Sequence, residues 1–329
     1  MNIYDIAQKA GVSIATVSRV INGNPSVSKK TREKVTKVMD ELGYTPNVFA
    51  RGLMVNSMKT IGVMTVDVRD LYYARAIQTI ESVMRLRGYD VILCSTSTDI
   101  EEKRKYLKLL LQKSVDGIIL VGSIFKEKDD NSHIIEASEK VPVVIINGDI
   151  HAKNIYTILN DDCEGVYTAV NYLVSLGHKD MIYLYDVDTF SGMEKINGFK
   201  KGIQQNHLSI SKHSILKVTK DIQGAYTAIK NLLEQKQPFS AVLTSDDILA
   251  VGAMKALREA GISVPNDCAV VGYGNSIISE CTTPALTSID SKVEATSSQA
   301  ANLLADVLEE KNMPNKTIIV PELVIRETT

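Results

Sequence analysis

Cysteine and histidine are scarce in this sequence, and neither forms a recognisable metal-binding pattern. Among 329 residues there are 4 cysteines and 5 histidines. The cysteines are widely spaced and include no CxxC pair, which argues against a disulfide framework and against a zinc site. The histidines form no HxxxH or HExxH pattern. We therefore expect neither a metal nor another cofactor.

Long apolar runs and catalytic signatures are missing as well. No apolar stretch approaches the ~20 residues of a membrane span, and the first residues show an amphipathic pattern instead of a secretory signal. The nucleophile elbow GxSxG, the phosphate-binding GxxxxGKS/T and a complete GxGxxG are all absent. These absences predict a cytoplasmic protein that is not an enzyme and does not contact a membrane.

The net charge of −2 is small, but the charge is unevenly distributed along the chain. Residues 1–59 carry 9 Lys and Arg against 4 Asp and Glu, a balance of +5, whereas residues 60–329 carry 28 against 35, a balance of −7. A small basic segment on an acidic body is typical of a domain that meets a polyanion such as DNA.

The first 22 residues predict two short helices joined by a tight turn. The apolar residues of the first helix recur at i, i+3, i+4 and i+7: Ile3, Ile6, Ala7 and Ala10. Gly11 ends this helix and Ser13 caps the second one. The outward face of the second helix carries small residues, hydroxyls and one arginine, so it could enter a DNA major groove. An ordinary helical hairpin is the alternative.

A third, basic helix follows, and after it a short segment that cannot be stable alone. Ser28 caps the third helix and Gly43 ends it. Its inward face consists of Val35, Val38, Met39 and Leu42. Beyond Pro46, residues 48–55 are long enough for about two helical turns, which need a partner because nucleation is costly.

The run IYDIAQKAGVSIATVSRVINGNPSVSKKTREKV, with LGYTPNVFARGL after it, resembles the head and hinge of the LacI/GalR family of bacterial transcriptional regulators. The resemblance implies a homodimer that binds a palindromic operator and orders two hinge helices on it. It also implies minor-groove contacts from Ala50, Arg51 and Leu53, with Leu53 as a wedge between base pairs.

The resemblance assigns base reading to the start of the second helix. The base-reading residues are then Ile14, Ala15, Thr16 and Arg19, and the residues at the DNA backbone are Tyr4, Ser13, Ser18, Asn22, Ser28 and Thr31. Arg19 can bond a guanine with two hydrogen bonds. The pair Ile14-Ala15 resembles the catabolite-control branch of the family, which implies an operator with a central CG step.

From residue 60 onward, strand-like and helix-like segments alternate. Apolar strand candidates lie at 61–66, 89–94, 117–121, 142–146, 181–185, 214–218, 241–244 and 268–272, and amphipathic helix candidates at 72–87, 101–113, 163–176, 193–205, 223–235 and 247–260. This alternation predicts parallel sheets with right-handed crossovers. We expect two doubly wound α/β lobes, with a ligand cleft at the carboxyl ends of the facing strands.

The body also resembles the family, whose fold is like that of the type I periplasmic sugar-binding proteins. The resemblance implies three crossings between lobes, near Leu159, Ile289 and Ile319. The expected parts are a helix-turn-helix head at 1–46, a hinge helix and linker at 47–59, a first lobe at 60–159 and 290–318, and a second lobe at 160–289 and 319–329.

The family's effector positions contain several departures here. The expected effector-binding residues are Arg69, Asp70, Tyr72, Tyr73, Ser123, Asn147, Ser191, Lys195, Asp246 and Tyr273. Lys195 stands where the family often has an arginine, Gly274 where it has an acid, and Gly148 where it has another arginine. Asn275 is the neighbour that could replace the lost acid.

These departures leave several alternatives open. Arg69 and Asp70 either bind a ligand or pair with each other, and Tyr72 either stacks on a ligand or packs. A simple sugar is in doubt, so we expect an unidentified small-molecule effector, with a protein corepressor as the alternative. The segment 275–280 lacks the arginines that the catabolite-control branch uses for such a partner. A solute-binding module is a further alternative, which the basic head disfavours.

Overall fold

The computed structural model describes residues 2–21, 24–44 and 57–329. The chain divides into two compact units, a head of residues 1–59 and a body of residues 60–329, and each is described by itself. Among the described residues, no helix is both long and apolar enough to cross a bilayer.

The head consists of three helices around one apolar core. They are α1 (Ile3–Ala10), α2 (Ile14–Ile21) and α3 (Lys29–Glu41). Asn2 and Asp5 form a capping box at the start of α1, because each side chain accepts a hydrogen bond from the other's backbone amide. Gly11 ends α1 in the left-handed conformation, with φ of 60°. The buried core residues are Ile6, Ala7, Ala10, Val17, Val20, Val35 and Val38.

The caps predicted for the other two helices are confirmed. The hydroxyls of Ser13 and Ser28 accept hydrogen bonds from the amides of Thr16 and Thr31, at 3.2 Å in both cases. The predicted hinge residues Ala50, Arg51 and Leu53 lie outside the described residues, as does Asn22.

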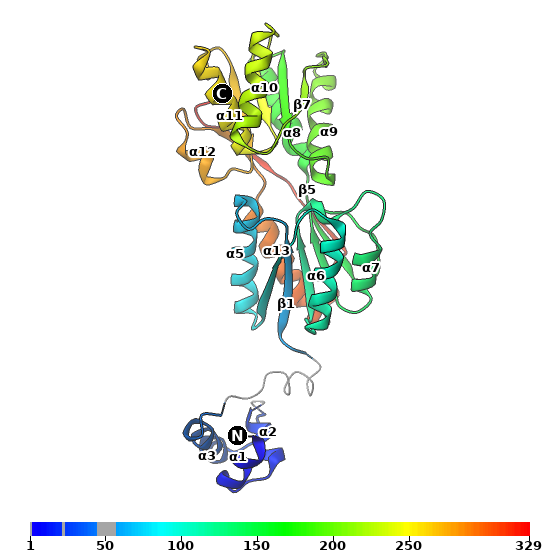
Figure 1. Ribbon diagram of the computed structural model, residues 1–329, viewed down its shortest axis with the longest axis vertical. Coiled ribbons are helices and arrows are strands. Elements are labelled where there is room, and N and C mark those ends of the chain that lie inside the picture. Colours follow the sequence, from blue (N-terminus) through cyan, green and yellow to red (C-terminus); the bar gives the residue numbers. More distant parts are fainter. Residues whose placement is uncertain (1, 22–23, 45–56) are drawn as a thin grey trace. The chain divides into compact units, whose positions relative to one another are not determined.

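The body contains two six-stranded sheets with helices on both faces (Figure 1). The first sheet has the order β11-β5-β4-β3-β1-β2 and the second β12-β10-β9-β8-β6-β7. All pairings are parallel except that of β10 with β12. The central strands β3, β4, β8 and β9 are buried along their whole length, as expected when helices cover both faces of a sheet.

The elements of the first sheet and its helices are β1 (Thr60–Thr65), α5 (Leu71–Leu86), β2 (Asp90–Ser95), α6 (Ile100–Gln112), β3 (Gly117–Val121), a 3-10 turn η1 (Ser123–Phe125), α7 (Ser132–Ser138), β4 (Val143–Ile146), β5 (Ile155–Asn160), α13 (Val293–Leu308) and β11 (Lys316–Ile319).

The elements of the second sheet and its helices are α8 (Asp162–Ser175), β6 (Met181–Tyr185), α9 (Phe190–Gln205), β7 (Ile215–Lys217), α10 (Ile222–Glu234), β8 (Ala241–Thr244), α11 (Asp247–Glu259), β9 (Ala269–Tyr273), α12 (Ile277–Cys281), β10 (Thr287–Asp290) and β12 (Glu322–Val324).

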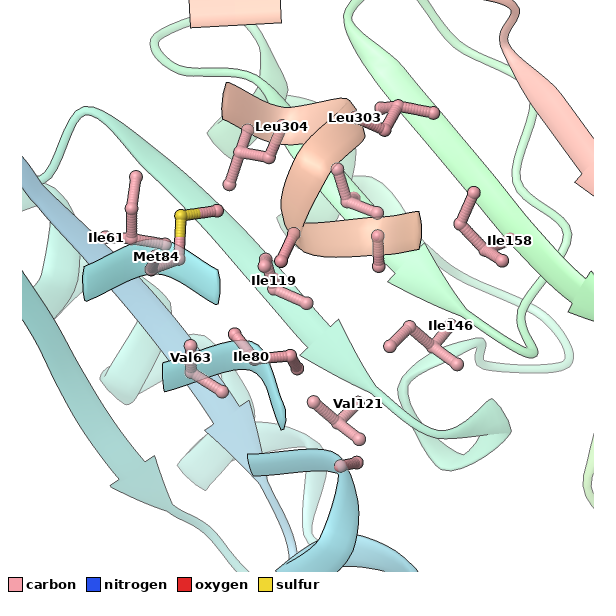
Figure 2. Packing of buried hydrophobic residues seen from close by; sticks show 14 of the residues in the cluster. Ile61, Val63, Ile80, Met84, Ile119, Val121, Ile146, Ile158, Leu303 and Leu304 are labelled. Atoms are coloured by element: carbon pink, nitrogen blue, oxygen red, sulfur yellow. The ribbon is translucent and has the colours of Figure 1, made fainter. Parts of the chain in front are cut away.

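The chain passes between the two sheets three times: after β5, after β10 and between β11 and β12. As a result α13, drawn in orange in Figure 1, packs beside α5 of the first lobe although the second lobe separates them in sequence. Figure 2 shows the resulting core, in which Ile61 and Val63 of β1 face Ile80 and Met84 of α5, with Leu304 of α13 beside them.

In the second lobe, α8 and α9 approach closely because the contact is made at a glycine. A Cβ on Gly198 would lie 2.2 Å from the backbone oxygen of Cys163. No side chain fits at that distance without a shift of one helix.

We therefore expect Gly198→Ala to lower the free energy of unfolding by about 1–3 kcal/mol, the usual cost of overpacking. Urea denaturation measures this change. Asn197→Ala, at an exposed position of the same helix, is the control for helix propensity. Equal stability of the two variants would contradict the tight contact.

Candidate functional site

The exposed face of α2 carries the predicted base-reading residues. Ile14 is 40% exposed, and Ala15 and Arg19 are exposed. The hydroxyl of Thr16 lies 2.9 Å from that of Ser13, so it is partly engaged in the helix cap. This face presents a forked cation beside small apolar groups, which suits contact with base edges in a major groove.

The predicted backbone-contacting residues lie around the same helices. Tyr4 is 65% exposed at the start of α1, although it is a large aromatic residue. Ser13 and Ser28 each cap a helix, so the hydroxyl oxygen of each already accepts a hydrogen bond from a backbone amide. Both serines are exposed, so the N-termini of α2 and α3 face solvent. Helix N-termini of this kind can bond phosphate oxygens.

In the body, two adjoining cavities lie between the lobes. The inner chamber has a volume of about 120 Å³ and the outer chamber about 460 Å³. All ten residues predicted for effector binding line at least one of them: Arg69, Asp70, Tyr72, Tyr73, Ser123, Asn147, Ser191, Lys195, Asp246 and Tyr273. The sequence therefore identified side chains that the fold brings together at the carboxyl ends of both sheets.

A buried carboxylate organises the second-lobe wall of the inner chamber. Asp162, the first residue of α8, accepts hydrogen bonds from the hydroxyls of Ser191 and Tyr273. Lys195 lies with its Nζ 3.6 Å from the centre of the Tyr273 ring and donates to the backbone oxygen of Ser245 at 3.1 Å. Burial raises the pKa of Asp162 above its ordinary value, although Lys195 opposes the shift.

The first-lobe wall is built on Asn147, which has a positive φ of 59° at the end of β4. Its Oδ1 accepts from the amide of Asn160 at 2.8 Å, and its Nδ2 donates to the hydroxyl of Tyr72 at 3.3 Å. Tyr72 packs edge to face on Tyr73. Burial raises the pKa of both tyrosines, so both are neutral hydrogen-bonding groups.

Two side-chain contacts join the lobes across the chambers. Ser123 donates to the hydroxyl of Thr189, the cap of α9, at 2.9 Å. Lys220 bonds Asp70 of the first lobe at 2.6 Å and Asp246 of the second at 3.1 Å. Polar contacts between the lobes thus border both chambers.

The alternative that Arg69 pairs with Asp70 is wrong. Arg69 instead bonds both carboxylate oxygens of Asp67, at 2.9 and 3.0 Å, and these bonds hold the pKa of Asp67 down at about 2. Asp70 is unavailable to Arg69 because one of its oxygens caps α5 through the Tyr72 amide and the other faces Lys220.

Asn275 does not replace the acid missing at position 274. Its Oδ1 accepts from Arg326 at 2.7 Å, which turns it away from the chambers. Gly274 has a φ of 115°, a conformation that disfavours any side chain, and its carbonyl accepts from Arg75 at 3.1 Å. The backbone at this position therefore makes a further contact between the lobes.

Three charged residues of the inner chamber were not predicted from the sequence: Asp162, Asp186 and Lys220. Asp162 follows β5 of the first sheet, and Asp186 and Lys220 follow β6 and β7 of the second. A polar residue in the connection between a strand and a helix is the signal that could have identified them. Among the residues that the structure describes, no set of three His, Cys, Asp or Glu could hold a metal. The four cysteines are free.

Two family models match the chain. Residues 2–47 match the bacterial regulatory proteins of the lacI family, and residues 170–329 match a periplasmic binding protein-like domain. The combination defines a transcriptional regulator with a DNA-binding head and a body of the periplasmic-binding-protein type.

Full-length relatives support the same assignment. An HTH-type transcriptional regulator of Lachnoclostridium phytofermentans is 45% identical over 331 residues, covering 100% of this chain and 99% of the relative. The repressor PurR of Histophilus somni is 32% identical, covering 99% of this chain and 98% of the relative. A crystal structure of the lac repressor dimer bound to operator and the anti-inducer ONPF has a TM-score of 0.89 and 26% identity, covering 100% and 98%.

The chain belongs to the LacI family of bacterial regulatory proteins. It is a DNA-binding transcriptional regulator, and because the family consists of regulators it is not an enzyme.

Beside the chambers, Asp247 has a structural role. Its two oxygens accept three hydrogen bonds, from the amide and hydroxyl of Ser276 at 2.7 and 2.8 Å and from the hydroxyl of Ser288 at 2.6 Å. Burial outweighs these bonds and raises its pKa to about 6.

This shift predicts a pH dependence of stability. The pKa of Asp247 in the folded state lies above the ordinary value of about 3.9, so the folded state binds this proton more tightly than the unfolded state does. Protonation of Asp247 therefore stabilises the folded protein below pH 4, and this stabilisation is lost as the pH rises through about 6. Urea denaturation between pH 4 and 7 should show the stability of the wild type falling relative to Asp247→Asn by up to about 1.4 kcal/mol per pH unit. The exposed Asp129→Asn variant should follow the wild type. A constant difference between wild type and Asp247→Asn would contradict the raised pKa.

Proposed function

We propose that this regulator is a repressor that binds a palindromic operator as a homodimer and responds to a small molecule between its lobes. The observation that carries the proposal is the pairing, in one chain, of an exposed recognition face on α2 with a polar cleft in the body. Similarity over the full length to a lac repressor dimer bound to operator and an anti-inducer supports it.

Specificity comes from Arg19 in this proposal. Its side chain is exposed on α2, and a guanidinium bonds O6 and N7 of guanine together, which is worth about 1–3 kcal/mol against other bases. Ile14 and Ala15 offer only apolar contact, which suits a thymine methyl group. Tyr4, Ser13, Ser18, Ser28 and Thr31, with Asn22, contact the DNA backbone, while Ala50, Arg51 and Leu53 contact the minor groove.

We expect Arg19→Ala to weaken binding to an operator selected from a random palindromic library by roughly 10- to 100-fold, because the bidentate base contact is lost. Fluorescence anisotropy on operator and scrambled duplexes measures both affinities. Arg19→Lys keeps the positive charge but loses the planar guanidinium that makes two hydrogen bonds to one base. This variant should bind scrambled DNA like the wild type and bind the operator poorly. Equal losses on both duplexes would refute base reading by this residue.

The homodimer is supported by an apolar groove on the second lobe. The groove has a volume of about 490 Å³, and its apolar lining comes from Ile222, Val251, Met254, Ile262, Val264 and Pro284. These residues are mostly half-buried, with Ile222 exposed, and an accessible apolar groove of this kind is typical of a protein interface. We assign it to a second copy of the chain, since the lac repressor to which the chain is similar is a dimer.

The effector in this proposal is a small polar metabolite, of carbohydrate type or otherwise. Hydroxyls, amides and charges line the inner chamber together with three tyrosines, a mixture that suits a compact ligand with several hydrogen-bonding groups. A protein corepressor is the second candidate, and the absence of arginine from residues 275–280 disfavours it.

A thermal-melting panel of sugars, sugar phosphates, nucleosides and amino acids tests the effector site. A ligand at a hundred times its dissociation constant adds about 2.7 kcal/mol of stability and raises the melting midpoint. Lys195→Met should reduce that shift by more than half, because Lys195 lines the inner chamber. Lys200→Met, at an exposed position of the same helix, should preserve it. No shift with any compound would favour the protein corepressor.

A further inference from the structure

Lys220 occupies a particular place in the cleft. It lies in the loop between β7 and α10 of the second lobe and lines both the inner and the outer chamber. Its ammonium group bonds Asp70 Oδ2 at 2.6 Å and Asp246 Oδ2 at 3.1 Å. Because Asp70 belongs to the first lobe, this one side chain ties the two lobes together where the chambers meet.

The two carboxylates are held in place by the helices that they cap. Asp70 Oδ1 accepts from the amide of Tyr72 at 2.9 Å at the start of α5. Asp246 Oδ1 accepts from the amide of Ile248 at 3.0 Å at the start of α11. Each carboxylate therefore accepts a hydrogen bond from its helix with one oxygen and contacts Lys220 with the other. The helix caps thus hold both carboxylates in the positions at which they bind the ammonium group.

Two carboxylates share the ammonium group of Lys220, whose side chain is 38% exposed. Burial alone would lower the pKa of Lys220, but Asp246 and Asp70 outweigh burial and the pKa lies above its ordinary value. The side chains of Asp70 and Asp246 are 17% and 28% exposed, so solvent screens them only in part.

We propose that Lys220 is an ionic latch that holds the lobes closed without an effector, and that entry of an effector into the inner chamber requires release of Asp70. This inference rests on the proposed effector cleft. The inner chamber alone, at about 120 Å³, is smaller than the roughly 150 Å³ engineered cavity that holds benzene, and it adjoins the outer chamber of about 460 Å³. Lys220 and Asp246 line both chambers, and Asp70 lines the outer one, so a ligand that passes from the outer chamber into the inner one meets this contact. Lys220 joined to Asp70 also opposes any separation of the lobes that would enlarge the inner chamber.

The variants separate the latch from the helix caps. Lys220→Met removes the ammonium and keeps most of the volume. Asp70→Asn removes the charge but keeps the cap of α5, because asparagine caps helices as well as aspartate does. Asp99→Asn is the matched control, since Asp99 caps α6 through the amide of Glu101 at 2.7 Å and bonds no lysine among the contacts of the described residues.

The first measurement is hydrogen exchange by mass spectrometry on the full-length protein without effector. Lys220→Met and Asp70→Asn should raise exchange in residues 70–75 and also in residues 189–192. The second segment meets the first lobe through the bond between Ser123 and Thr189, so it reports separation of the lobes and not only loss of a local bond. Asp99→Asn should leave both segments as in the wild type. Unchanged exchange at 189–192 in both latch variants would overturn the proposal.

The second measurement is a double-mutant cycle on the melting midpoint. Lys220→Met should lower the midpoint by about 2–4 °C in the wild-type background, and by less than half as much when Asp70→Asn is present. Together with Asp99→Asn, its effect should be additive. Additivity with Asp70→Asn would overturn the latch. Neither measurement uses an effector or DNA, so failure of the latch leaves the proposed function standing, and failure of the ligand panel leaves the latch testable.

Discussion

The parallel arrangement of the two sheets is the constraint on which the cleft depends. In a parallel sheet every strand leaves at the same edge, and the following helix begins there. The starts of α5, α8, α9 and α11 consequently face the space between the lobes. Their amide groups require caps, and three of these caps, Asp70, Thr189 and Asp246, also line the chambers. The residues that stabilise these helices thus become the residues available to a ligand.

Several acids therefore serve the fold and the cleft together. Asp70 and Asp246 each divide their two oxygens between a helix cap and Lys220. Asp247 differs, because all its hydrogen bonds go to Ser276 and Ser288 and it anchors the connection after β9. Asp246 and Asp247 are adjacent and of the same type, but their side chains leave the start of α11 in different directions, so they have separate roles. Loss of Asp247 would disturb the fold, whereas loss of charge at Asp70 would disturb only the contact between lobes.

The pattern of apolar residues and the residues that begin and end helices were sufficient to predict most of the architecture. The eight predicted strands match the observed ones to within about one residue at their ends, because most of their apolar runs are buried on both faces. The edge strands β2 and β7 are the exceptions, since they are only partly buried. The strands β5, β10, β11 and β12 were not predicted. Thr157 and Asn160 of β5, and Thr287 and Ser288 of β10, are buried polar residues that interrupt the apolar pattern. Contacts distant in sequence could not be predicted either, since the partner of Asp70 lies 150 residues away and spacing alone suggested its neighbour Arg69.

The departures at Lys195, Gly148 and Gly274 suggest a weakened effector site when each is considered alone. The structure adds groups that position-by-position reasoning did not include. Asp162 is buried against the hydroxyls of Ser191 and Tyr273, and Asp186 accepts from the hydroxyl of Ser245 at 2.7 Å. Burial of a carboxylate costs free energy unless compensating contacts offset it, and the two hydroxyls and the nearby Lys195 supply such contacts for Asp162. Charged groups on other elements thus line the same cleft, and they are compatible with the small polar ligand proposed above.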